Sequence, residues 1–417
     1  AAARRLAGQV ARWQAGGTPS AAEYRHALRQ VVGHCIYGVD LNAMAVELCK
    51  VSLWMEALEP GLPLTFLDSH VQHGNALLGA TPQLLDKGIP DAAWDAIEGD
   101  DKKTASALKK RNKAASGGQR GLDSLWSQPS DGEAATVVRA AQDLESASDA
   151  DLGLLHQKES RWQSILDSAE FRRQRLVADM FCAAFVWPKQ PGPLAEAAPV
   201  SGLWLQLRDH KGVVPALTLE TTCALATQYH FLHWHLAFPH IFATGGFDVV
   251  LGNPPWERVK LQEQEFFASR SAEIATASNA SVRKKLIATL PDTDPNLWKE
   301  WCAASREAEG QSHLIRQSGR YPLCGKGDIN TYALFAEHNR TILAPKGRAG
   351  FIVPTGIATD DTTKEYFGSL VAESQLARFY SFENEEFIFP SVHHAFKFAL
   401  LSIDRSGRST AADLVFF

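Results

Sequence analysis

Asn253, Pro254, Pro255 and Trp256 are consecutive, and they follow the apolar run 247–252, which is typical of a buried strand. The Asn253 side chain and the Pro254 backbone C=O are two oxygen acceptors that can hold both hydrogens of a planar, conjugated NH2 group. Held in this way, the nitrogen is drawn toward a tetrahedral shape, and its delocalised lone pair becomes free to attack. The prolines stiffen the turn and remove competing N–H donors, and Trp256 offers a flat face for a base. The tetrad therefore suits methyl transfer to a conjugated amino nitrogen.

A sheet must position this tetrad, and strand signals occur on both sides of it. They are short apolar runs bounded by polar or turn residues, at 35–40, 64–68, 349–354, 377–382 and 396–403. Helical patterns lie at 1–16, after an N-cap at Ser20 with Glu23 as its capping-box partner, at 42–57 and at 328–343. Alternating strands and helices predict a mostly parallel, doubly wound α/β sheet with helices on both faces.

Ligands of such sheets bind beyond the carboxyl ends of the strands, and two further polar residues fall there. Asp40 closes the first strand, where a carboxylate can accept hydrogen bonds from both ribose hydroxyls of a nucleoside cofactor. An N-cap of the helix at 42–57 is the alternative role for Asp40. Asn75 lies in the loop after the second strand and could contact an adenine edge, or it could be an ordinary loop residue. With Asn253, these residues outline a nucleoside pocket beside a clamp for an amino group.

Composition sets the broad class of the protein. The 417 residues exceed one ordinary domain, and 45% hydrophobic with 21% charged residues is usual for a globular protein. No apolar run is long enough to span a bilayer, so we expect no membrane association. The six cysteines are scattered without a Cys-x-x-Cys pair, which argues against a zinc site or a disulfide framework and fits a reducing cytoplasm. A net charge of −5 restricts any nucleic-acid surface to a local patch.

Strand signals vanish between residues 82 and 235, where Ala, Gln, Lys, Arg and Glu dominate, so we expect a helical insertion there. We therefore divide the chain into residues 1–81, the N-terminal part of the α/β core, residues 82–235, the helical insertion, and residues 236–417, the C-terminal part of the core. The last part carries a second helical insertion at about 257–325.

Several segments together resemble the S-adenosylmethionine-dependent N6-adenine DNA methyltransferases of the gamma motif order. More narrowly, the sequence is similar to the DISARM and BREX methyltransferases of bacterial phage-defence islands and to type II restriction-modification methylases. The resemblance lies, in the family's order, in IYGVDLNAMAVELCKVSLWMEALEPGLPLTFLD, HGNALLG, FDVVLGNPPWERVKLQEQEFF, GRAGFIVPTG and FPSVHHAFKFALLSI. It implies a Rossmann-like class I methyltransferase sheet, S-adenosylmethionine as cofactor and double-stranded DNA as partner, with no metal.

The resemblance also implies roles for single residues. Asp40 corresponds to the acid that binds the ribose, and Asn75 stands where the family often has an Asp that contacts the cofactor adenine. The tetrad 253–256 corresponds to the catalytic clamp. Phe389, before a proline, matches an aromatic position that stacks on the far side of the flipped base, opposite Trp256.

One family feature is missing from the sequence. The family binds the methionine part of its cofactor with a Gly-rich turn, typically Asp-Pro-Ala-Cys-Gly-Ser-Gly, after the first and central strand. We expect that turn, and that strand, to lie just before Ala1, so that the chain is a fragment with an incomplete sheet and little activity alone. Its end in the apolar run 415–417 also looks cut, and a target-recognition region is expected beyond it.

The interpretation is site-specific methylation of adenine N6 in DNA by a cytoplasmic enzyme of a bacterial phage-defence or restriction-modification system. Other defence-system proteins are expected as partners. Two alternatives stay open. A protein glutamine N5-methyltransferase uses the same tetrad, because an amide nitrogen is also planar and conjugated. An inactive DNA-binding or scaffold subunit of a defence complex would account for the missing Gly-rich turn as a real loss.

Overall fold

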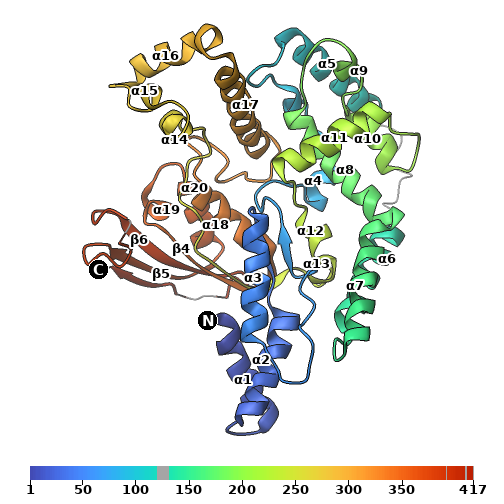
Figure 1. Cartoon of the computed structure of the whole chain (residues 1–417), viewed down its shortest axis with the longest axis vertical. Coiled ribbons are helices and arrows are strands. Elements are labelled where there is room, and N and C mark those ends of the chain that lie inside the picture. The colour runs from blue at the N-terminus through green and yellow to red at the C-terminus, as the bar shows by residue number, and fades with distance from the viewer. Residues whose placement is uncertain (120–130, 391, 409–410, 417) are drawn as a thin grey trace.

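The computed structural model describes residues 1–119, 131–390, 392–408 and 411–416. Within these residues the strands form two sheets (Figure 1). The smaller sheet pairs β1 (Gly38–Asp40) in parallel with β2 (Val71–His73). The larger sheet has the order β3-β4-β6-β5-β7, and its strands are β3 (Phe247–Gly252), β4 (Leu343–Pro354), β5 (Leu376–Glu383), β6 (Lys397–Asp404) and β7 (Asp413–Phe416).

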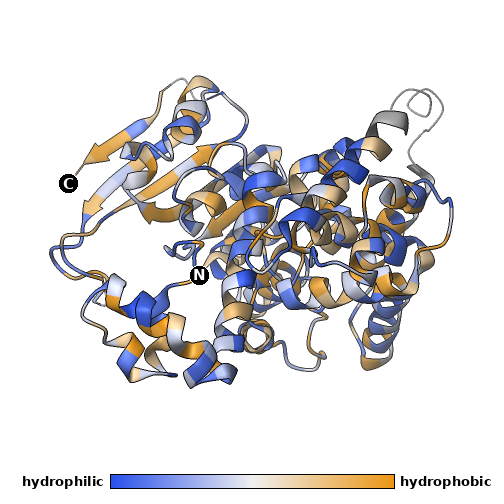
Figure 2. Cartoon of the chain, turned by 90° about the horizontal axis from the view of Figure 1, so that it is seen from above, coloured by the Kyte–Doolittle hydropathy of each residue, from blue (hydrophilic) through white to orange (hydrophobic). Residues whose placement is uncertain are grey.

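The larger sheet is mixed. β3 pairs with β4 and β5 with β7 in parallel, whereas β6 runs antiparallel to β4 and β5. β6 departs from the expected parallel arrangement because the chain reverses after β5 through the loop 384–396, without the crossover that a parallel pair requires. The carboxyl ends of β3, β4 and β5 consequently lie at one edge. Apolar residues follow the strands of this sheet (Figure 2).

Three helices make up most of the N-terminal part: α1 (Ala2–Ala15), α2 (Ala21–Cys35) and α3 (Ala43–Glu56). The capping box of α2 is confirmed, since Ser20 accepts from the Glu23 N–H while the Glu23 side chain accepts from the Ser20 N–H. One face of α3 stays exposed and apolar, through Met44, Leu48, Val51 and Met55.

The strand predicted at 64–68 is wrong. That segment has no regular structure and ends in a turn at Asp68, and the carbonyl of Thr65 accepts a hydrogen bond from the indole of Trp54 (2.7 Å). The second strand of the small sheet is β2, three residues further on, in a stretch expected to belong to the following loop. Asp68 therefore lies before this strand, and Asn75 is the second residue after it.

Helices fill the segment between the two sheets. They are α4 (Pro82–Lys87), the 3-10 helix η1 (Asp91–Trp94), α5 (Lys102–Gln119), α6 (Asp131–Ser146), α7 (Leu152–Asp167), α8 (Ala169–Val186), α9 (Pro193–Glu196), α10 (Ser201–Arg208), α11 (Ala216–Tyr229), α12 (Trp234–Ala237) and α13 (Pro239–Ala243). The centre of this group is α8, whose residues 177–186 are all buried. Its neighbours include α10 and α11 (Figure 1).

A second helical region follows β3, and three helices then frame β4. The bounds are α14 (Glu263–Ala268), α15 (Ala272–Ala275), α16 (Ala280–Thr293), α17 (Pro295–Gln317), α18 (Thr331–Ile342), α19 (Gly356–Thr359) and α20 (Lys364–Ala372). α14–α16 and the start of α17 have a small hydrophobic core of their own, formed by Phe267, Ile274, Ile287, Leu290 and Leu297. None of the helices in the described part of the chain has the length and apolarity that a membrane crossing requires.

A buried ion cluster joins the two helical regions. The side chains of Asp100 and Lys189 are fully buried, with Lys189 Nζ 3.3 Å from Asp100 Oδ2. Arg306 of α17 donates to Asp100 Oδ1 (2.7 Å), and the backbone N–H groups of Ile97 and Lys189 also donate to this carboxylate. Desolvation lowers the pKa of Lys189 to about 8, against the attraction of Asp100. Asp100 thus connects the segment before α5, the end of α8 and α17.

Replacing Asp100 with Ala leaves two cationic side chains facing a site without a counter-charge. We expect the free energy of unfolding to fall by about 3–5 kcal/mol, as for other buried pairs that lose one partner. Urea denaturation followed by circular dichroism measures this change. The matched control is Asp167→Ala, which breaks an exposed pair with Arg172 and should cost less than about 1 kcal/mol. Equal costs for the two variants would contradict the structural role of Asp100.

Candidate active site

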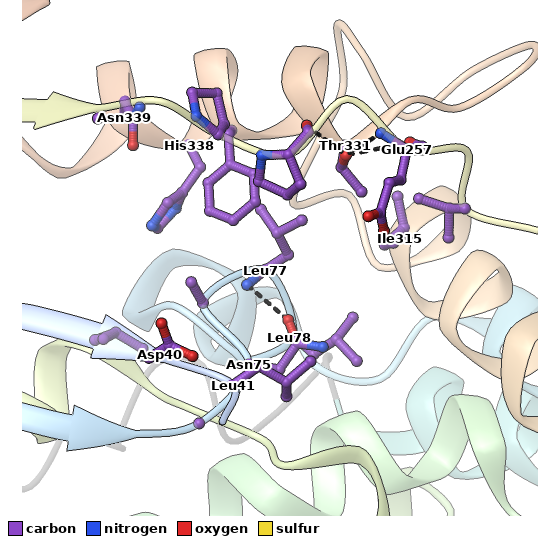
Figure 3. A pocket seen from close by; sticks show the side chains of 18 of the residues that line it. Asp40, Leu41, Asn75, Leu77, Leu78, Glu257, Ile315, Thr331, His338 and Asn339 are labelled. Atoms are coloured by element: carbon purple, nitrogen blue, oxygen red, sulfur yellow. Dashed lines mark hydrogen bonds between the residues drawn. The ribbon is translucent and has the colours of Figure 1, made fainter. Parts of the chain in front are cut away.

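A cavity of about 870 Å³ lies between the carboxyl ends of β1 and β3. Asp40, Leu41 and Asn75 lie on one side of it, and Thr331, His338 and Asn339 lie on the other (Figure 3). The cavity also extends down between the two sheets, because the facing parts of β1 and β3 line it. The cavity is therefore lined by Asp40 at the end of β1, Asn75 after β2 and Asn253 after β3. Ligands of α/β sheets bind at such strand ends.

Asp40 is exposed at the cavity wall and ends β1. Its Oδ1 accepts a hydrogen bond from the backbone N–H of Asn42 (2.7 Å). The N-cap of α3 is Asn42 itself, whose side chain accepts from the N–H groups of Met44 and Ala45. Capping of α3 is thus done by Asn42, and among the described residues nothing hydrogen-bonds to Asp40 Oδ2. A carboxylate fixed through one oxygen keeps the other for a ligand.

Asn75 follows β2 and is held on both its backbone and its side chain. Its N–H donates to the carbonyl of His230 (2.7 Å), and its carbonyl accepts from the Leu78 N–H (3.1 Å). The side-chain Oδ1 accepts from the Leu77 N–H (3.0 Å), drawn as a dashed line in Figure 3. One lone pair of this oxygen is therefore used by the turn, and a second stays available toward the cavity.

The tetrad loop begins directly after β3, and three of its residues line the cavity. Asn253 is exposed, and its side chain makes no hydrogen bond with any described residue. The same holds for the carbonyl of Pro254, whereas the carbonyl of Pro255 accepts from the hydroxyl of Thr331 (2.7 Å). Both acceptors that the clamp needs are thus without a protein partner among the described residues.

Trp256 and Phe389 are not among the residues that line the cavity. Trp256 is half-buried and packs against the main hydrophobic core, and its indole N–H is buried without a hydrogen-bond partner among the described residues. Phe389 packs edge-on against Phe398, with the ring centroids 5.0 Å apart. Its loop emerges at the same edge of the sheet as the tetrad and is held by Asn384, which donates to the Phe389 carbonyl (3.1 Å). The structure therefore brings Asp40, Asn75 and Asn253 together but not the two aromatic rings.

The helix predicted at 328–343 is present as α18, and it forms the wall of the cavity that faces Asp40. Five of its residues line the cavity: Thr331, Phe335, His338, Asn339 and Ile342. The sequence analysis did not assign these residues to the site. Their helical spacing indicates that they share one face, but only the tertiary structure places that face beside the tetrad.

His338 is the most deeply buried polar residue of this wall, with only 3% of its surface exposed. Arg320 lies on its Nδ1 side (3.3 Å), and since a guanidinium can only donate, Nδ1 must be the acceptor. Nε2 then carries the proton, and no described residue bonds to it. Desolvation, and secondarily the charge of Arg320, holds the pKa of His338 well below its ordinary value. The wall is therefore uncharged at this point.

The family model described as Eco57I restriction-modification methylase matches residues 34–285. The matched span is more than half of the chain, and it includes Asp40, Asn75 and the tetrad. It ends before α18 and before Phe389. Comparisons with curated proteins and with solved structures find no match.

The buried state of His338 predicts a pH dependence of stability. In the unfolded chain this histidine takes up a proton below about pH 6.5, whereas in the folded protein its lowered pKa keeps it neutral. The unfolded state therefore binds more protons, and the free energy of unfolding falls as the pH falls from about 6.5. In His338→Gln this part of the slope is lost, up to about 1.4 kcal/mol per pH unit. Urea denaturation at several pH values measures it.

His156→Gln serves as the control, because His156 is exposed on α7 and its replacement should leave the slope as in the wild type. Other buried histidines with lowered pKa values, such as His313, contribute with the same sign in every variant. The difference between wild type and His338→Gln is therefore the quantity to read. Identical slopes in these two proteins would mean that His338 takes up a proton in the folded protein as readily as in the unfolded chain.

Proposed function

We propose that this chain, which belongs to the Eco57I restriction-modification methylase family, methylates the N6 amino group of adenine in duplex DNA with S-adenosylmethionine as the methyl donor. Membership of the family makes the protein a DNA methyltransferase of a restriction-modification system. The choice of adenine and of the methyl donor is our inference. The observation that carries it is the pair of unpartnered acceptors on Asn253 and Pro254, at a cavity whose other wall carries Asp40.

The clamp supports an amino group as the reacting centre. An exocyclic NH2 of a base has two hydrogens and a lone pair that is delocalised into the ring. Asn253 Oδ1 and the Pro254 carbonyl would each accept one hydrogen, which orients the nitrogen and weakens its conjugation. The contribution of the protein is then positioning and hydrogen bonding at the reacting nitrogen.

The wall that carries Asp40 and Asn75 supports a nucleoside cofactor. A cavity of about 870 Å³ falls in the range of roughly 300–1,000 Å³ that is usual for small-molecule sites. Asp40, fixed by the Asn42 N–H, would accept from the ribose hydroxyls through its unpartnered oxygen, and Asn75 would meet the adenine edge. S-adenosylmethionine, when bound, supplies an electrophilic methyl group on a positively charged sulfur. The remaining wall is neutral or apolar at His338 and Phe335, which suits a planar, uncharged ring.

Duplex DNA can present this amino group only after the base leaves the stack, since the group is otherwise paired and out of reach. We propose that Trp256 and Phe389 sandwich the extruded base, as the resemblance implies. Both rings would have to leave their present packing, Trp256 on the main core and Phe389 on Phe398, to reach the cavity. That rearrangement is part of the proposal and belongs to the DNA-bound state.

A further parallel strand between β1 and β3 also belongs to the proposal. Among the described strands, β1 pairs only with β2, and β3 has β4 as its one neighbour, so both have an unpaired edge. Val249 and Leu251 of β3 are 59% and 63% exposed, although parallel strands are usually buried on both faces. One strand bonded to both edges, with the Gly-rich turn at its end, would join the two sheets into the Rossmann-like sheet that we expect.

The family favours DNA over a protein glutamine as substrate. The gamma motif order, the narrower likeness to DISARM or BREX enzymes, defence-system proteins as partners and a cytoplasmic location stay predictions. An inactive scaffold role would require that the clamp acceptors are not used, and the variants below test this.

Asn253→Ala removes one of the two acceptors and should lower the rate of methyl transfer by about 100-fold or more, as for other single groups that act mainly in the transition state. The measurement is N6-methyladenine formed in DNA, detected by mass spectrometry of the nucleosides. Binding of S-adenosylmethionine, measured by calorimetry, should stay close to wild type. The matched control is Asn279→Ala, which removes the N-cap of α16 away from the cavity. Unchanged adenine methylation in Asn253→Ala would rule out the clamp.

Asp40→Ala should act on the cofactor instead of the base. Loss of a charged acceptor for the ribose hydroxyls costs about 1.5–3 kcal/mol, so the Kd for S-adenosylmethionine should rise by about 10- to 100-fold. Calorimetric titration measures it, with Asp86→Ala as control, since Asp86 is exposed on α4. A Kd that does not change in Asp40→Ala would place the nucleoside elsewhere.

A further inference from the structure

Thr331 is the first residue of α18 and is joined to the tetrad loop by several hydrogen bonds. Its hydroxyl donates to the Pro255 carbonyl (2.7 Å) and accepts from the backbone N–H of Glu257 (3.0 Å). Its own backbone N–H donates to the Glu257 carbonyl (2.8 Å). Figure 3 shows the hydroxyl of Thr331 between these partners at the edge of the cavity. One side chain therefore contacts both ends of the short turn 255–257.

Neighbouring residues extend this connection into a short two-stranded contact. The Val259 N–H donates to the carbonyl of Ile329 (3.0 Å), and Arg258 forms an antiparallel bridge with Asn330. The turn 255–257 is thus fixed on one side by β3, which ends at Gly252, and on the other by its hydrogen bonds to Thr331. We call these hydrogen bonds the second anchor of the loop. A loop held at both ends has little freedom to reorient its carbonyl groups.

The two prolines explain why the second anchor must come from elsewhere in the chain. Pro254 and Pro255 have no N–H, so the turn has few donors of its own to satisfy its carbonyl groups. The acceptors of this stretch include Asn253 Oδ1, the Pro254 carbonyl and the Pro255 carbonyl. An NH2 group has only two hydrogens, so a third free acceptor would permit alternative poses of the base. Thr331 occupies the third acceptor and leaves the other two.

We infer that Thr331 is a positioning residue of the methyl-transfer site: its hydroxyl binds the Pro255 carbonyl and thereby directs the Asn253 and Pro254 acceptors at the target amino group. This inference rests on the proposed function. Thr331 itself does not contact the base, and it acts through the tetrad loop. It lies outside residues 34–285, the part that matches the family model.

The test compares Thr331→Val, which keeps the shape but lacks the hydroxyl, with Thr331→Ser, which keeps the hydroxyl. In steady-state DNA methylation we expect kcat of Thr331→Val to fall about tenfold or more, with the KM values for DNA and S-adenosylmethionine within about threefold of wild type. Thr331→Ser should restore kcat to within about threefold of wild type. If Thr331 only stabilised the fold, Thr331→Ser would not restore kcat while the KM values stay unchanged.

The rate of amide hydrogen exchange is a second measurement, and it does not depend on enzymatic activity. The Glu257 amide should exchange faster in Thr331→Val than in wild type or Thr331→Ser, because its acceptor is gone. The matched control is Thr341→Val, at the far end of α18, where the hydroxyl bonds only to the Glu337 carbonyl. It should leave both kcat and exchange of the 255–259 segment unchanged.

The outcomes separate the two proposals. A wild-type enzyme that methylates DNA, together with an unchanged kcat in Thr331→Val, overturns the inference about Thr331 and leaves the proposed function standing. Faster exchange at Glu257 without loss of kcat overturns it as well, since the anchor would then not matter for transfer. A wild-type enzyme that binds S-adenosylmethionine but transfers no methyl group to adenine overturns the proposed function, and with it the role of Thr331.

Discussion

The parallel pairing of β3 with β4 is the constraint on which the site depends. Parallel strands cannot be joined by a tight turn, so the chain must leave β3, cross over a face of the sheet and return to start β4 at the opposite edge. The last part of this crossover is α18, which runs directly into β4. Its first turn consequently lies beside the carboxyl end of β3, where the tetrad loop begins. The wall of the cavity and the second anchor of the loop both result from this one pairing.

The two helical regions affect the site indirectly, by fixing the position of one cavity wall. α17 reaches both the cavity wall and, through Arg306, the buried Asp100 near the end of α8. The position of one wall is thereby tied to the large helical region. An ion pair this deeply buried adds little net stability, but removing one partner is costly because it leaves an uncompensated buried charge.

Much of the site could be predicted from the sequence because its residues stand at strand ends. Asp40 and Asn253 were identifiable since each follows an apolar run, and the edge at which parallel strands end is shared. β2 could not be located, because its three residues carry no apolar alternation and a better strand pattern lies just before them at 64–68. The orientation of Trp256 and the packing of Phe389 depend on rotamers and on loop closure, about which local sequence says nothing. Thr331 was missed for a different reason: its partner Pro255 is distant in the chain, and only the crossover brings them together.

The hydrogen bond between Val259 and Ile329 has a consequence for how such enzymes diversify. It closes the second helical region at its base, where the chain leaves the site and returns to it at neighbouring positions. Within this region α17 also packs against α8, whereas α14–α16 lie before it in the chain. Chain stretches whose two ends touch can change in length or content without displacing the scaffold that carries them. Because α14–α16 have a small core of their own, this portion could differ between related enzymes while the contact of residues 258–259 with 329–330 and the packing of α17 are kept.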